Sequence, residues 1–299
     1  MEQNMPAARG RSAGVAALVG SALSNQLGAA SGSLAFPAMG PLGVVAVRQL
    51  VAAVVLLPAV RPDLRAFSRG QWWPVLSLGL VFGAMNLSLY AAVERIGLGL
   101  AMTLEFLGPL AVAIVGVRTW AGKACALPAA AGVVAITQPG PSTDYVGIAL
   151  GLTAAACWAA YIALNKTVGA RIPGIQGTAA AAGVSAAIFL PAVLLVFATR
   201  RPDVPTILFA VGAGILATVV PYTVDLLALR RIPANLYGIL ASVNPVFAAV
   251  IGVVALHESL RASQWAGIAL IVGANVVAVL LNHRGPASGA PRAAAAGPA

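Results

Sequence analysis

The chain has 299 residues, of which 60% are hydrophobic and 9% charged, and its mean hydropathy is +0.92. Soluble domains are about half apolar and about a quarter charged, so this composition excludes a soluble globular protein and indicates an integral membrane protein. The formal net charge of +10 does not predict a nucleic-acid partner, because the basic residues are scattered singly between apolar runs.

The apolar runs predict an all-α integral membrane protein whose helices are surrounded by membrane lipid. A helix needs about 20 mostly apolar residues to cross the bilayer core. By this measure the sequence predicts ten transmembrane helices, at residues 13–35, 41–60, 72–93, 98–117, 122–138, 145–167, 176–198, 205–228, 234–255 and 263–282. Residues 1–12 are predicted to form a cytoplasmic tail, and the low-complexity segment 283–299 a disordered cytoplasmic tail.

The two halves of the chain match at a constant offset of 136 residues. The matched pairs are Arg95 and Arg231, Pro109 and Pro245, Gly116 and Gly252, and Pro37 and Pro173. We interpret this match as an internal duplication, with one repeat over residues 13–138 and the other over 145–282. Five spans in each repeat is an odd number, so the second copy must enter the membrane upside down. Inverted repeats of this kind are typical of secondary transporters.

The basic residues predict the orientation of the chain. With both termini in the cytoplasm, 13 of the 18 Lys and Arg residues fall in cytoplasmic segments. Arg48 falls inside the membrane, and the four predicted outside are Arg95, Arg200, Arg201 and Arg261. An excess of Lys and Arg in cytoplasmic loops is the general rule for membrane proteins.

Three charged side chains fall more than two residues inside the predicted spans. Arg48 and Glu105 each lie about seven residues from the outer end of their spans, which at 1.5 Å per residue is roughly 10 Å deep. Their equal depth and opposite charge favour a pair, and three alternatives are open. The two residues form a structural salt bridge, or they line a cavity in which Arg48 meets a substrate carboxylate and Glu105 an amine or a proton, or they make no contact at all. A charge at a helix centre is costly to insert, so each needs a partner or a function. Asp225 lies closer to the inner end of its span, where pairing with Arg230 and a functional role are both open.

Several uncharged polar residues also fall within spans. Asn86 and Tyr90 are four residues apart, hence on one helical face. The others that we consider as substrate- or proton-pathway candidates are Asn25, Gln26, Tyr222 and Asn244. Most such residues form hydrogen bonds between helices, worth about 0.6 kcal/mol on average, so no single one is strong evidence of a site.

The sequence does not predict an enzyme or a metal centre. It has no HExxH or GxSxG motif, and neither His257 nor His283 lies in the middle of a span. Cys125 and Cys157 have no metal-ligand spacing, and no cofactor is predicted. A channel is a weaker alternative. Asn244-Pro245 resembles a water-channel motif, but the equivalent position in the first repeat holds Gly108-Pro109, so the second copy of the motif is absent.

Several motifs resemble those of one transporter family. They are Met85 to Tyr90, Leu104 to Phe106, Gly108 to Ala113, Pro221 with Tyr222, Ala228 to Pro233, and His257 to Leu260. Over residues 13–282 the chain resembles the EamA family of the drug/metabolite transporter superfamily, and within it the bacterial threonine/homoserine exporters. Asp225 stands where these exporters tend to have Glu, and Asn244 stands where some have Glu.

The resemblance implies an inner-membrane secondary carrier that exports small amino acids such as threonine and homoserine, with the proton as coupling ion. The alternatives are an EamA carrier for another metabolite or drug, and a membrane channel. A homodimer is left open.

The orientation gives a direct test of the duplication. Cysteine-accessibility labelling or reporter fusions are expected to place Arg65 and Arg230 in the cytoplasm, and Asp144 and Arg201 outside. Glu94 and Arg230 lie in equivalent turns of the two repeats. Finding both on the same side of the membrane would rule out the inverted duplication.

Overall fold

The computed structural model describes residues 5–116, 120–138, 143–221, 224 and 242–283. In these ranges every regular element is a helix and no strand occurs. The helices are α1 (Met5–Leu34), α2 (Phe36–Val60), α3 (Arg69–Ile96), α4 (Leu98–Glu105), α5 (Leu107–Gly116), α6 (Trp120–Ala124), α7 (Ala126–Thr137), α8 (Tyr145–Arg171), α9 (Gln176–Arg200), α10 (Val204–Gly214), the π-helical turn η1 (Ile215–Val219), α13 (Asn244–Ala255) and α14 (Ala262–His283). The predicted C-terminal tail from residue 284 onward lies outside the described residues.

The helices have the length and surface expected for a membrane protein. Six of them, counting α4 and α5 together, are long and apolar enough to cross a bilayer, and three shorter apolar helices accompany them within the described ranges. Large apolar side chains face outward, including Val115 at 86% exposure and Leu127 at 74%. Exposing such a surface to water would be unfavourable, whereas contact with lipid tails would not. The prediction of an all-helical membrane protein is therefore confirmed.

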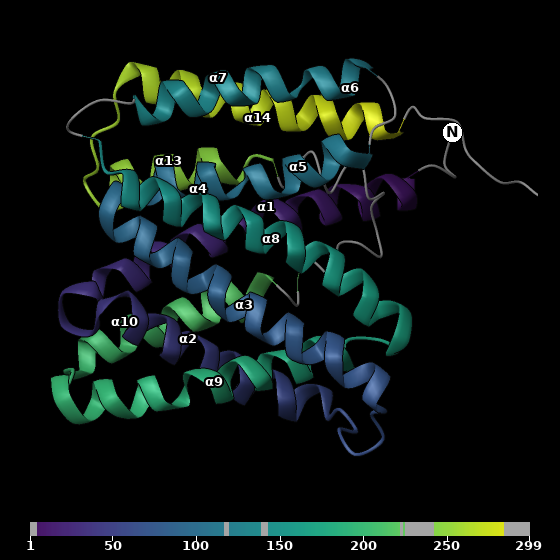
Figure 1. Ribbon diagram of the computed structural model, residues 1–299, viewed down its shortest axis with the longest axis vertical. Coiled ribbons are helices and arrows are strands. Elements are labelled where there is room, and N and C mark those ends of the chain that lie inside the picture. The colour runs from purple at the N-terminus through teal and green to yellow at the C-terminus, as the bar shows by residue number, and fades with distance from the viewer. Residues whose placement is uncertain (1–4, 117–119, 139–142, 222–223, 225–241, 284–299) are drawn as a thin grey trace, which may run out of the picture.

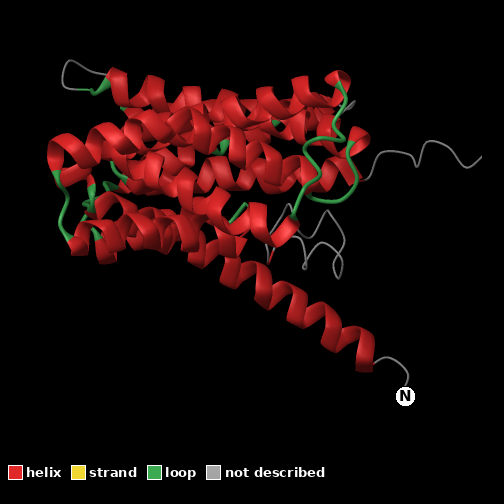
Figure 2. Ribbon diagram, turned by 90° about the horizontal axis from the view of Figure 1, so that it is seen from below, coloured by secondary structure: helices red, strands yellow, loops and turns green. Residues whose placement is uncertain are grey.

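Several spans predicted as single continuous helices are interrupted in the structure. The span predicted at 98–117 consists of α4 and α5, which are separated at Phe106. The span predicted at 122–138 consists of α6 and α7, separated at Cys125. The helix predicted to start at residue 205 passes from α10 into η1, and α1 begins earlier than predicted, at Met5, where it extends away from the bundle (Figure 2).

Helix α2 lies at the centre of one half of the bundle. It packs against α9, α10, α3 and η1, as Figure 1 shows in the lower part of the view. Its residues Val44 to Val47 are all buried, so α2 is apolar on every side over that stretch. A helix that is apolar all round belongs in a protein interior. The next residue after this run is Arg48, which therefore enters the interior as well.

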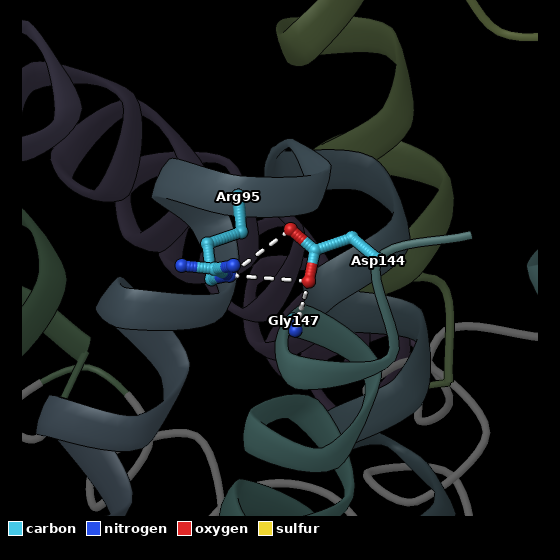
Figure 3. Close-up of polar contacts among 3 residues, drawn as sticks. All are labelled: Arg95, Asp144 and Gly147. Carbon is cyan, nitrogen blue, oxygen red and sulfur yellow. Dashed lines mark hydrogen bonds and ion pairs between the residues drawn. The ribbon is translucent and has the colours of Figure 1, made fainter. Parts of the chain in front are cut away.

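Polar contacts fasten both ends of α3 to α8. At one end, Arg95 Nε lies 3.0 Å from Asp144 Oδ2, and Asp144 Oδ1 accepts a 2.8 Å hydrogen bond from the Gly147 N–H (Figure 3). Asp144 thus caps the first turn of α8. At the other end, Arg171 Nη1 donates to the Gly70 carbonyl at 2.7 Å. The two helices run antiparallel between these clamps.

The Arg95–Asp144–Gly147 contacts predict how the packing of α3 against α8 responds to mutation and pH. The Gly147 N–H, and after it Arg95, hold the pKa of Asp144 below its ordinary value of 3.8. Because the folded-state pKa is depressed, the stabilisation is complete above pH 3.8 and is lost as the pH falls through the lower folded value. We expect Asp144→Ala to lower the thermal unfolding temperature at pH 7.

Asp144→Asn is the matched control, because it keeps a capping oxygen and loses the charge. Its unfolding temperature should lie between those of Asp144→Ala and the wild type. Equal unfolding temperatures for all three proteins would show that the clamp does not stabilise the fold.

Candidate functional site

Arg48 is held inside the bundle by hydrogen bonds to η1. Its side chain is only 7% exposed. Its Nε donates to Thr218 Oγ1 at 2.9 Å, and its Nη2 donates to the Ala217 carbonyl at 2.8 Å. The guanidinium carbon also lies 5.3 Å from the centre of the Tyr90 ring, within cation–π range. The described residues provide no partner for Nη1, so one edge of the guanidinium remains available.

The local sequence explains why η1 offers a carbonyl to Arg48. In a regular α-helix the Ala217 carbonyl would accept from the N–H of residue 221, but Pro221 has no N–H. The π turn adds a second free carbonyl, because the Val220 N–H bonds to Ile215 and leaves Leu216 unpaired within the helix. Ser24 Oγ on α1 donates to that Leu216 carbonyl at 2.8 Å. Side chains of α1 and α2 therefore complete the backbone hydrogen bonding of η1.

Helix α1 approaches η1 closely at a glycine. A Cβ on Gly28 would lie 2.5 Å from the Ala217 nitrogen and 2.7 Å from the Ala217 Cβ, so no larger residue fits there without displacement. Small residues at helix contacts allow this approach in membrane proteins. The close contact brings α1 to the same turn of η1 that Arg48 binds.

Glu105 lies at a second helix interruption. It is the last residue of α4 and is 4% exposed. Pro109 follows four residues later, so the Glu105 carbonyl also lacks an α-helical donor. The regular hydrogen bonding is interrupted at Phe106, although its φ of −64° and ψ of −12° keep the chain on a helical course. No hydrogen bond or ion pair to the Glu105 carboxylate occurs within the described ranges. A buried carboxylate in this condition is costly unless it binds a proton or a cation.

Of the alternatives left open for Arg48 and Glu105, the structural salt bridge is absent from the described residues. The described part of the chain contains one ion pair within 4 Å, between Arg95 and Asp144. Arg48 attracts Glu105 only electrostatically, across a longer distance. The physical reason is that the free carbonyl and hydroxyl of η1 satisfy Arg48 first. The two buried residues of opposite charge therefore attract each other but do not form an ion pair within the described ranges.

The structure brings some of the predicted polar candidates together and separates others. Gln26 Nε2 on α1 donates to Asn244 Oδ1 at the start of α13, at 3.1 Å. Asn86 and Tyr90 share a buried face of α3, where Asn86 Nδ2 donates to the carbonyl of Phe82 at 2.8 Å. Asn25 is half-buried beside Gln26. Tyr222 and Asp225 lie outside the described residues.

Sequence reasoning missed several polar residues near these candidates. Thr218 and Ser24 bind at η1, and their role depends on backbone carbonyls that a residue pattern does not display. Gln49 and Ser185 are fully buried, and their side-chain polar atoms have no partner among the described residues. The detectable signal was Pro221 in an apolar segment, which marks a free carbonyl four residues earlier.

Glu258 was also missed, because it lies between predicted spans. Its carboxylate accepts from the backbone N–H of Leu98 at 2.6 Å and of Gly99 at 3.4 Å. It therefore caps the start of α4, where the preceding Gly97 has a φ of +85° that favours glycine. Glu258 fixes one end of the short helix that carries Glu105 at its other end.

The arrangement places a buried cationic group and a buried carboxylate inside the bundle. Within the described ranges, no three His, Cys, Asp or Glu side chains gather closely enough to hold a metal. Arg48 offers an anion-binding edge and Glu105 a cation- or proton-binding carboxylate. A small pocket with a volume of about 10 Å³, about enough for one water molecule, lies between α2, α3, α8 and α9, and its lining includes Leu56, Phe82 and Ala181.

Comparison with known proteins identifies relatives over most of the chain. Residues 145–280 match the model of the EamA-like transporter family. The threonine/homoserine exporter RhtA of Salmonella typhimurium (strain SL1344) is 32% identical over 268 residues, covering 87% of this chain and 89% of the exporter. RhtA of Escherichia coli (strain K12) is 32% identical over 258 residues, covering 85% and 87%. The uncharacterized transporter YwfM of Bacillus subtilis (strain 168) is 26% identical over 250 residues, covering 78% and 82%.

One crystal structure of a protein has the same arrangement of helices. It superposes with a TM-score of 0.58 at 22% identity, covering 92% of this chain and 99% of that chain. At this identity the likeness concerns the fold alone.

A double-mutant cycle tests whether the missing N–H of Pro221 anchors Arg48. In Pro221→Ala, residue 221 regains an N–H that can satisfy the Ala217 carbonyl. Arg48→Met should then cost less stability in the Pro221→Ala protein than in the wild type. We expect a coupling free energy of about 1 kcal/mol or more, measured by unfolding in detergent.

Pro191 provides the control for this cycle, because it also interrupts hydrogen bonding inside a helix but belongs to α9. Arg48→Met and Pro191→Ala should be additive. Equal coupling in both cycles, or none in either, contradicts the role given to Pro221.

Proposed function

Because the chain belongs to the EamA-like transporter family, we propose that it is a secondary carrier of the bacterial inner membrane that exports small amino acids of the threonine and homoserine type. The observation that carries this proposal is the pair of buried, opposite charges at Arg48 and Glu105 that make no direct contact within the described residues. An amino acid is a zwitterion, with a carboxylate and an ammonium group a short distance apart. It can satisfy both charges at once.

The two residues take different roles in the proposed cycle. The free edge of the Arg48 guanidinium binds the substrate carboxylate, as planar guanidinium groups commonly do. The Glu105 carboxylate binds the substrate ammonium group or a proton, and these two occupants exclude each other. Such exclusion couples outward movement of substrate to inward movement of a proton. Membrane-embedded carboxylates serve this purpose in many transporters.

We also propose ten spans in two inverted repeats, over residues 13–138 and 145–282, with both termini in the cytoplasm. Packing between equivalent helices supports the repeats. The 136-residue offset relates α2 to α9 and α7 to α14, and the two members of each pair lie side by side (Figure 1). The same offset relates α3 to α10. The contact between α3 and α9 therefore has its equivalent in the contact between α10 and α2, and both contacts are present.

The direction of these equivalent helices supports the inversion. Gly43 of α2 packs against Val196 of α9, whereas Leu57 of α2 packs against Gly183. The residue numbers therefore run in opposite directions along the two helices. Equivalent helices that are antiparallel are related by an axis in the membrane plane, which is the arrangement of inverted-repeat transporters.

The substrate class is tested by export in cells. Cells that express the chain and lack other threonine exporters should resist added threonine and homoserine and should release both faster than cells without it. Unchanged resistance and unchanged efflux, with normal membrane expression, contradict the amino-acid assignment. Efflux of a different amphiphilic metabolite in the same cells would support the alternative carrier function.

Glu105→Gln tests the coupling in the same cells and in proteoliposomes. The amide keeps the shape of the side chain but carries neither the charge nor an exchangeable acidic proton. Net efflux driven by a pH gradient should fall to the level of empty vesicles, while the purified protein remains folded. Glu94→Gln, on the exposed end of α3, removes the same charge and should leave transport unchanged.

The double variant Arg48→Met, Glu105→Gln separates cavity residues from a structural pair. A stable but inactive double variant supports the cavity role. Recovered transport in the double variant contradicts it, because the two charges would then serve only to hold helices together.

A further inference from the structure

Gln49 is a buried amide with neither polar atom satisfied. It is 1% exposed, and neither Oε1 nor Nε2 has a hydrogen-bond partner in the described part of the chain. An unsatisfied buried polar group costs about 1–3 kcal/mol, and here two such atoms belong to one side chain. A leucine or methionine of similar size would avoid this cost. The amide is therefore a good candidate for a group whose partner arrives from outside the chain.

Gln49 lies on the face of α2 that also carries one of the residues lining the pocket between α2, α3, α8 and α9. It lies seven residues before Leu56, which lines the pocket, so both residues occupy one face of the helix. It is also the neighbour of Arg48 in the sequence, one position along the same turn. Gln49 therefore lies within the same turn of α2 as the residue to which we assign the substrate carboxylate.

The register of α2 and α9 gives the depth of Gln49. Gly43 packs against Val196 and Leu57 against Gly183, so Gln49 is level with about residue 190 of α9. Of the other buried side chains with an unpartnered polar atom, Ser185 on α9 lies about five residues nearer the pocket, which is roughly 8 Å along the helix. Gln49 lies at the depth of Arg48, and so does Tyr90, whose ring faces the Arg48 guanidinium and whose buried hydroxyl also has no partner in the described part of the chain.

We propose that Gln49 selects substrates that carry a side-chain hydroxyl group. An amide both accepts and donates hydrogen bonds, so Oε1 can accept the hydroxyl proton and Nε2 can donate to the hydroxyl oxygen. An amino acid without the hydroxyl leaves both amide atoms unpaired. Sites that hydrogen-bond a substrate hydroxyl discriminate strongly against analogues that lack it. The inference rests on the proposed function, since it requires an amino acid bound at Arg48.

The test compares substrates that differ only in the hydroxyl. The full chain is reconstituted in liposomes, and uptake of L-threonine, L-homoserine and L-2-aminobutyrate is measured against an internal pool of the same compound. The wild type should favour the two hydroxylated substrates over 2-aminobutyrate by about tenfold or more in kcat/KM. Gln49→Met should bring this ratio close to one and should leave 2-aminobutyrate transport intact or faster.

Stability separates this role from a structural one. Gln49→Met removes two unpaired polar atoms, so its unfolding temperature should equal or exceed that of the wild type. Gln49→Leu serves as a second apolar variant, and Gln49→Asn, which keeps an amide, should keep part of the preference. Ser185→Ala is the matched control, because it removes another unpartnered buried polar atom at a different depth and should leave the ratio unchanged.

Two outcomes overturn the inference. If Gln49→Met lowers kcat/KM equally for all three substrates, the preference for hydroxylated substrates is preserved and the amide does not bind the substrate hydroxyl. If Ser185→Ala abolishes the ratio and Gln49→Met does not, the wrong residue has been assigned. A wild type that carries none of the three amino acids indicates instead that the proposed function is wrong.

Discussion

The site depends on one constraint, which is that a backbone carbonyl inside a membrane protein must find a donor when proline removes the helical one. In the π turn the Val220 N–H bonds to Ile215 instead of Leu216, and Pro221 has no N–H to donate to Ala217, so the carbonyls of Leu216 and Ala217 both lose their α-helical donors. Ser24 satisfies the first and Arg48 the second. These bonds connect α1, α2 and η1, and they give a buried guanidinium a fixed position beside Tyr90. The cost of burying Arg48 is offset by the same bonds that complete the helix.

A proline has a related effect on the acidic side of the site. Pro109 separates α4 from α5 immediately after Glu105, and Glu258 holds the opposite end of α4 by its backbone N–H groups. Glu105 thereby lies directly before the residue at which the hydrogen bonding of the span is interrupted, although Phe106 keeps helical dihedral angles. Arg48 uses its hydrogen bonds on η1, so it does not neutralise Glu105 by contact. The two interruptions together keep a cation and an anion buried and apart, which is the condition that a zwitterionic substrate requires.

Much of this could be predicted from the sequence, and the failures have identifiable causes. Apolar runs of about 20 residues predicted the helical membrane fold, and the burial of Arg48 and Glu105 followed from their positions in those runs. Of the alternatives left open for these two residues, the salt bridge does not occur, because Arg48 binds a backbone carbonyl that residue patterns do not show. Gln49 was overlooked because a neutral amide beside a buried arginine gives no signal until its lack of partners is known.

The central claim is that Arg48 and Glu105 bind the two charged ends of one amino acid. The most direct measurement is an experimental structure of the protein with L-homoserine bound. We predict the substrate carboxylate within hydrogen-bond distance of the Arg48 guanidinium, and the substrate ammonium group facing the Glu105 carboxylate. Homoserine bound elsewhere, with Arg48 and Glu105 joined in a direct ion pair, would contradict the claim.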